Sequence, residues 1–86
     1  MIDLFIEKGR IVRGPGVIQV KQNDHVVFHV TSDQADEMHL HGYNLRLRLK
    51  PRERATLEFD ARRTGRFTFE LHRLDAELGA LEVYPR

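Results

Sequence analysis

Apolar and polar residues alternate along most of this chain. In the segments 25–30 and 67–72, for example, every second residue is a large apolar side chain and its neighbours are mostly polar. A period of two turns one set of side chains toward a packed face and the other toward water, as in half-buried strands. The alternation predicts seven strands, at 2–7, 17–21, 25–30, 43–50, 55–60, 67–72 and 81–84.

Turn-forming residues separate the predicted strands. They are Gly14-Pro15-Gly16, Gln22-Asn23-Asp24, Lys50-Pro51 and Thr64-Gly65. A short amphipathic stretch at 74–78 predicts one helical turn, and no longer helical pattern occurs. About seven short strands with regular turns are typical of an all-β sandwich or a small barrel.

Composition limits the classes of protein that this chain can belong to. Its 86 residues make one domain, residues 1–86, with a net charge of +1 and 31% charged residues. No apolar run reaches the roughly 18 residues of a membrane span, so we expect no membrane partner. Because the chain has no cysteine, it has no disulfide, thiolate nucleophile or iron–sulfur cluster. A domain of this size buries only about 60% of its unfolded surface, so a metal ion or a homodimer would supplement a marginal core.

Five histidines are many for 86 residues. His25 and His29 lie on the polar phase of a predicted strand, which favours ordinary surface positions. His39 and His41 flank Leu40, and residues two apart in an extended chain point the same way, roughly 6.5–7 Å apart. Two imidazoles at that spacing can bind one ion, and imidazole suits copper, zinc and nickel. The alternative is that both histidines face solvent, or that one of them bonds to a loop carbonyl.

A second histidine segment follows the strand predicted at 67–72. His72 can join the pair if the two strand ends are neighbours, and Glu70 has the same phase and can supply an oxygen ligand. Met38 shares the phase of Leu40, so we interpret it as a core residue rather than a ligand. The predicted metal ligands are therefore His39, His41, His72 and Glu70.

Several segments in order resemble a known family. They are Thr31-Ser32-Asp33, His41-Gly42-Tyr43, Ala55-Thr56-Leu57-Glu58-Phe59, the run from Thr64 to His72, and the closing run from Leu78 to Val83. This order resembles the cupredoxins, the copper-binding Greek-key β-sandwiches of the plastocyanin type, over nearly the whole chain. The resemblance implies a Greek-key β-sandwich and makes His41 the counterpart of the first histidine ligand. It also implies a periplasmic or otherwise exported protein, although the first residues do not form a secretory signal.

The chain departs from the family's ligand set. Leu71 or Glu70 stands about where the cysteine ligand would be, and the closing loop has Glu77-Leu78 instead of a methionine. A blue-copper site needs the thiolate, so the resemblance is to a cysteine-less subgroup and excludes a blue-copper electron carrier. Three histidines without sulfur favour Cu(II) or zinc over Cu(I). The leading hypothesis is a small copper- or zinc-binding protein with a non-blue site that serves metal storage or delivery.

Other classes of function remain open at this stage. A metal-free cupredoxin-like module would bind a protein partner through a sheet edge or through its arginine-rich face. Nucleic-acid binding through the basic run 46–54 is disfavoured because aromatic side chains do not interleave with its arginines. An enzyme is not expected, since 86 residues leave little room for a substrate pocket and no nucleophile–base pair stands out.

Overall fold

The computed structural model describes residues 1–86 as nine strands and no helix. The strands are β1 (Ile2–Glu7), β2 (Arg10–Arg13), β3 (Val17–Lys21), β4 (His25–Ser32), β5 (Asp36–Leu40), β6 (Leu45–Leu49), β7 (Ala55–Asp60), β8 (Gly65–Leu71) and β9 (Ala76–Tyr84). The all-β class is confirmed. The strand count is nine rather than about seven, because the alternation did not separate β2 and β5 as strands of their own. No element is a helix with the length and hydropathy of a membrane-crossing segment.

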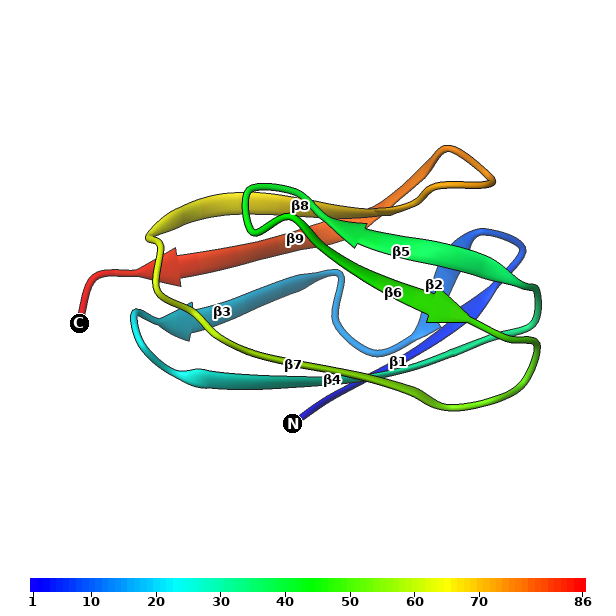
Figure 1. Cartoon of the computed structure of the whole chain (residues 1–86), viewed down its shortest axis with the longest axis horizontal. Coiled ribbons are helices and arrows are strands. Elements are labelled where there is room, and N and C mark those ends of the chain that lie inside the picture. The colour runs from blue at the N-terminus through cyan, green and yellow to red at the C-terminus, as the bar shows by residue number, and fades with distance from the viewer.

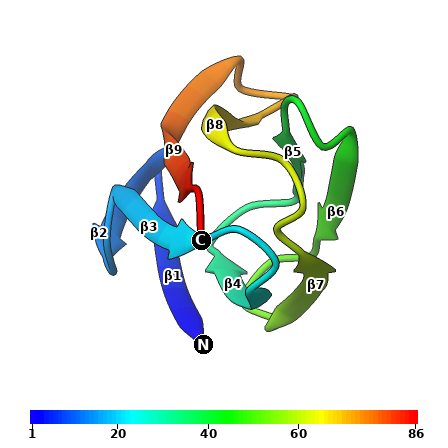
Figure 2. The same cartoon turned by 90° about the vertical axis from the view of Figure 1, so that its left-hand side faces the viewer.

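The strands form two mixed sheets that pack face to face (Figures 1 and 2). One sheet has the order β2-β1-β4-β7 and the other the order β3-β9-β8-β5-β6. The pairs β1–β4 and β3–β9 are parallel, and the remaining pairs are antiparallel. Figure 2 shows that the edge strands β6 and β7 lie beside each other, so the two sheets nearly close on that side.

The core lies between the sheets and comes from the apolar phase of the alternation. Phe28 of β4 and Phe69 of β8 are fully buried, and their rings meet edge-on at 5.8 Å between centroids. Aromatic pairs at this distance and angle contribute roughly 0.5–1.5 kcal/mol beyond the area that they bury. Met38 is 1% exposed and belongs to this core, as its phase predicted. The outward phase carries the polar side chains, including the candidate ligands.

The predicted helical turn at 74–78 is wrong. Residues 72–75 form a turn, and β9 begins at Ala76. The buried Asp36 carboxylate accepts hydrogen bonds from the backbone N–H groups of Arg73, at 2.7 Å, and Leu74, at 3.3 Å. These bonds hold the turn against the start of β5. Only the Asp75 N–H bonds within the turn, to the His72 carbonyl at 3.3 Å. Sequence alternation around Asp36 gave no sign of this contact.

Candidate metal centre

His39 and His41 lie on the outer face of the five-stranded sheet. In β5 the side chains of Asp36, Met38 and Leu40 point inward and are buried, so His39 points outward, and His41 follows in the same phase. The two imidazole rings lie 4.3 Å apart between centroids at a tilt of 54°. The expectation that His39 and His41 point the same way is confirmed.

The turn after β5 holds His41 in place. The backbone N–H of His41 donates to the Thr68 carbonyl of β8 at 3.0 Å. Gly42 follows with φ of +84°, and a Cβ there would lie 2.2 Å from Cδ1 of Phe67. Only glycine avoids both the left-handed strain and that clash. Glycine at position 42 is therefore a structural requirement of the turn that ends β5.

Glu70 joins the histidine pair from the neighbouring strand. It stands directly opposite His39 in the β5–β8 register, and its Oε1 lies 2.8 Å from Nε2 of His41. The His41 side chain is 43% exposed and that of Glu70 is 32% exposed, so an ion can reach them from solvent. Two imidazoles and one carboxylate thus occupy one small patch of the sheet. We call His39, His41 and Glu70 the histidine patch.

One ring nitrogen in the histidine patch has no partner. The Nε2 atom of His39 is buried and makes no hydrogen bond. Leaving a buried polar group unpaired costs about 1–3 kcal/mol, so such atoms are uncommon and call for an explanation. Nε2 of a neutral histidine is also a common metal-binding atom. An unpaired imidazole nitrogen beside a second imidazole has the donor chemistry that divalent copper and zinc accept.

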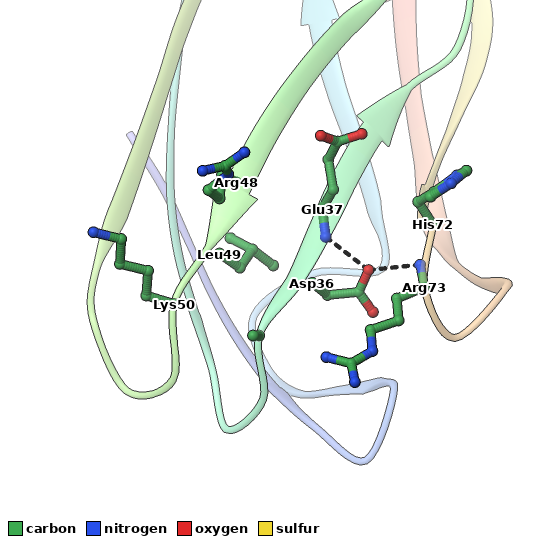
Figure 3. Close-up of a pocket in the computed structure, with 8 residues that line it drawn as sticks. Asp36, Glu37, Arg48, Leu49, Lys50, His72 and Arg73 are labelled. Carbon is green, nitrogen blue, oxygen red and sulfur yellow. Dashed lines mark hydrogen bonds between the residues drawn. The ribbon is translucent and has the colours of Figure 1, made fainter.

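His72 lies further along the same face. Its backbone N–H donates to the Glu37 carbonyl at 2.8 Å, which places it beside Glu37, two residues before His39 on β5. The side chain is exposed and borders a hollow of about 320 Å³ (Figure 3). No three histidine, aspartate or glutamate side chains are grouped so that they could hold a metal ion in this arrangement. The structure brings His39, His41 and Glu70 together but leaves His72 outside; the metal role of the four residues stays a prediction.

The hollow beside His72 is lined mainly by charged side chains. Figure 3 shows Arg48 and Lys50 on one side of it and His72 and Arg73 on the other. The cationic groups of Arg48, Lys50 and Arg73 make no side-chain hydrogen bond. The carboxylate of Asp36 at its floor bonds to backbone amides, as the dashed lines in Figure 3 show. The heads of the cations diverge, so they do not form a pocket for one small anion.

His25 and His29 lie on the other sheet. His25 is held between Asp60 of β7, at 2.9 Å from Nδ1, and Glu58, at 2.9 Å from Nε2. Hydrogen bonds to Asp60 and then to Glu58 raise the pKa of His25 above its ordinary value of 6.5. The hydrogen bond from His25 in turn lowers the pKa of Asp60. His29 lies 3.2 Å from the Thr56 hydroxyl. Surface positions were predicted for both histidines, but the carboxylate partners of His25 were missed because they depend on the β4–β7 register.

Comparisons with known proteins find the fold in solved structures. No family model matches the chain, and no curated protein is similar in sequence. The blue copper oxidase of Nitrosomonas europaea is 22% identical with a TM-score of 0.77, covering 98% of this chain and 38% of that one. A copper binding protein in its apo form is 16% identical with a TM-score of 0.73, covering 94% of this chain and 85% of that one.

A purple cupredoxin from Nitrosopumilus maritimus is 12% identical with a TM-score of 0.58, covering 80% of this chain and 78% of that one. The chain spans only 60% of the matched chain of a heme-copper terminal oxidase and 38% of the blue copper oxidase. At these identities the likeness establishes a common fold, which agrees with the two-sheet architecture and with the order of segments along the sequence.

Proposed function

The chain has the cupredoxin fold, and from that premise we propose that it is a small copper-binding protein with a non-blue site. The absence of cysteine removes the thiolate on which a blue-copper centre depends. What the chain offers instead is imidazole and carboxylate on one sheet face, a donor set that suits Cu(II) better than Cu(I). Zinc accepts the same donors and is the second metal to test.

The observation that carries this proposal is the unpaired Nε2 atom of His39 beside the His41 ring. A metal ion there would be bound by His39 and His41, with Glu70 as an oxygen ligand or as the hydrogen-bonding partner that orients His41. His72 would join only after its exposed side chain turns toward Glu70, which stands two residues before it on β8. A bound Cu(II) would supply a Lewis-acidic, nitrogen-coordinated centre.

Storage or delivery of the metal is the role that we propose for this site. The side chain of His41 is 43% exposed, so this side of the site is open to solvent and to another protein that gives or accepts the ion, whereas Nε2 of His39 is buried. An enclosed site would favour tight retention or electron transfer instead. We propose an exported location as well, where copper chaperoning by small domains has a use, and we propose no catalytic activity.

Copper titration of the untagged protein tests the proposal. We expect calorimetry to show one Cu(II) per chain, and electron paramagnetic resonance to show nitrogen hyperfine coupling. The double variant His39→Ala/His41→Ala should lose both signals, whereas His25→Ala/His29→Ala, with equally many histidines removed from the other sheet, should keep them. His72→Ala decides whether that residue is a ligand. Equal binding by the two double variants would contradict the assignment.

A second candidate is a metal-free interaction module with the same fold. It is favoured by the fact that no three ligating side chains are grouped for an ion, and by the hydrogen bond that already engages His41. The melting temperature separates the two functions, since an ion that binds only the folded chain must raise it. A module without metal would melt at the same temperature with Cu(II) and with a chelator.

A further inference from the structure

Strand β3 is an unprotected edge of the five-stranded sheet. It pairs with β9 on one side, and no other strand pairs with its opposite side (Figure 1). The other three edge strands are protected against strand pairing. β6 and β7 lie beside each other, and β2 begins and ends with an arginine, so an antiparallel pair of β2 strands would set Arg10 against Arg13.

The free edge of β3 carries the backbone groups of Val17 and Gln19. The Gly16 carbonyl accepts an N–H of β9 at 3.0 Å, and the Gln22 N–H donates to a carbonyl of β9 at 2.7 Å. Even-numbered residues of this segment therefore bond toward β9. Because the backbone groups of successive strand residues alternate in direction, the odd-numbered residues point to the open side.

This open stretch of backbone is closed at both ends. Lys21 is the third residue of β3 that points outward, but its N–H donates to the Asp24 carboxylate at 2.9 Å and its carbonyl accepts the Asp24 N–H at 3.0 Å. Before the strand, Pro15 has no N–H to donate. An added strand can therefore bond only to Val17 and Gln19, which sets the centre of the pairing at Ile18.

We propose that β3 of a second copy of this chain occupies the edge, in an antiparallel pair with Ile18 opposite the same residue of the second copy. Val17 then lies opposite Gln19, and the two residues exchange both backbone hydrogen bonds on each side of the two-fold axis. On the inner phase Gly16 lies opposite Val20, a small residue against a large one. No like charges are opposed, so the strand is complementary to itself.

The pairing joins the two five-stranded sheets into one continuous sheet, with both histidine patches on its outer face. It uses no residue of the histidine patch and is independent of the copper proposal. One added strand buries less than the about 1,200–2,000 Å² of a stable interface, so we expect a reversible dimer with a Kd on the order of 10⁻⁴ M.

Sedimentation velocity of the untagged chain tests the association. A chelator in the buffer excludes dimers that share a metal ion. Amide hydrogen exchange tests the register, because the N–H groups of Val17 and Gln19 should gain protection as the protein concentration rises. The N–H groups of Ile18 and Val20 already bond to β9, so their exchange should not depend on concentration.

Two double variants test the opposed residues. Val17→Glu/Gln19→Lys sets opposite charges against each other across the pair and should tighten the dimer about fivefold. Val17→Lys/Gln19→Lys sets like charges there and should weaken the dimer by at least that factor. The two variants change the same exposed positions and are matched controls for each other. Val17→Pro removes an outward N–H and should also weaken the dimer.

A chain that stays monomeric at about 1 mM would overturn the inference, because that concentration is well above the expected Kd. So would a dimer in which the two double variants associate equally tightly, since the residues at 17 and 19 would then not oppose each other. A dimer without added protection at the Val17 and Gln19 amides would place the contact elsewhere and overturn it as well. The copper titration decides the copper proposal separately, since the histidine patch lies within one chain.

Discussion

His41, the residue after β5, and Glu70 of β8 are joined by a contact of 2.8 Å between Nε2 and Oε1. The partners lie 29 residues apart in sequence, and only the sandwich brings them together. Because both side chains are partly exposed, this contact adds little to folding. Its value lies in fixing the orientation of an imidazole that the copper proposal makes a ligand.

Glu70→Gln tests whether the contact serves to orient the His41 imidazole or to stabilise the fold. Glutamine keeps an acceptor oxygen but removes the charge, so we expect Cu(II) binding to weaken about tenfold, as for other residues that support a metal ligand. The free energy of unfolding in urea should change by less than about 1 kcal/mol. Glu82→Gln, a carboxylate of β9 that pairs with Arg66, is the control and should leave copper binding unchanged. A variant that loses stability and copper together would assign Glu70 a structural role.

Gly42→Ala tests the turn that presents His41. The substitution places a Cβ at φ of +84° and against the Phe67 ring, so we expect a loss of about 1–3 kcal/mol in the free energy of unfolding. Gly16→Ala is the matched control: no atom lies within 4 Å of its Cβ, and its φ is not positive. The Gly16→Ala substitution should leave the free energy of unfolding unchanged or raise it slightly. Denaturant unfolding of the two variants measures the difference, and equal stabilities would show that the turn tolerates a side chain.

The alternation of residues predicted the all-β class and the shared orientation of His39 and His41, because both follow from the two-residue period of a strand. The alternation did not predict β2, because this strand has only four residues and one half-buried apolar side chain, Ile11. The position of His72 relative to the pair was beyond the sequence, since it depends on the register between β5 and β8. The position of Arg46 opposite His39 was beyond the sequence for the same reason, because it depends on the register between β5 and β6.

The cluster of His25, Glu58 and Asp60 makes the free energy of unfolding depend on pH, and the two pKa shifts give the direction of that dependence. The pKa of His25 is raised above 6.5 in the folded chain, so its contribution is fully present below 6.5 and is lost as the pH rises through the folded pKa. The pKa of Asp60 is lowered below 3.8, so its contribution is present above 3.8 and is lost as the pH falls through the folded value. The stabilising contributions of His25 and Asp60 are therefore both present between pH 3.8 and pH 6.5.

The stability difference between the natural chain and His25→Gln should therefore shrink as the pH rises above 6.5. Urea unfolding at several pH values measures it. The double variant Glu58→Gln/Asp60→Asn removes the cause of the shift, and in that background His25→Gln should give the same difference at every pH. A pH-independent difference in the natural background would show that the contacts of His25 with the two carboxylates do not persist in solution.

Asp36 provides the last test, because it ties the candidate site to the loop that carries His72. Its Oδ1 accepts the amides of Glu37 and Arg73 at 2.7 Å each, and the residue is only 8% exposed. Asp36→Ala leaves these amides without their acceptor, at a cost of about 1–3 kcal/mol for a buried unpaired group. Asp36→Asn keeps one acceptor oxygen and should lose less. Hydrogen exchange should report the same order, with the Arg73 amide exchanging fastest in Asp36→Ala. Unchanged exchange at Arg73 would mean that water replaces the carboxylate, and that the turn at 72–75 holds its shape without Asp36.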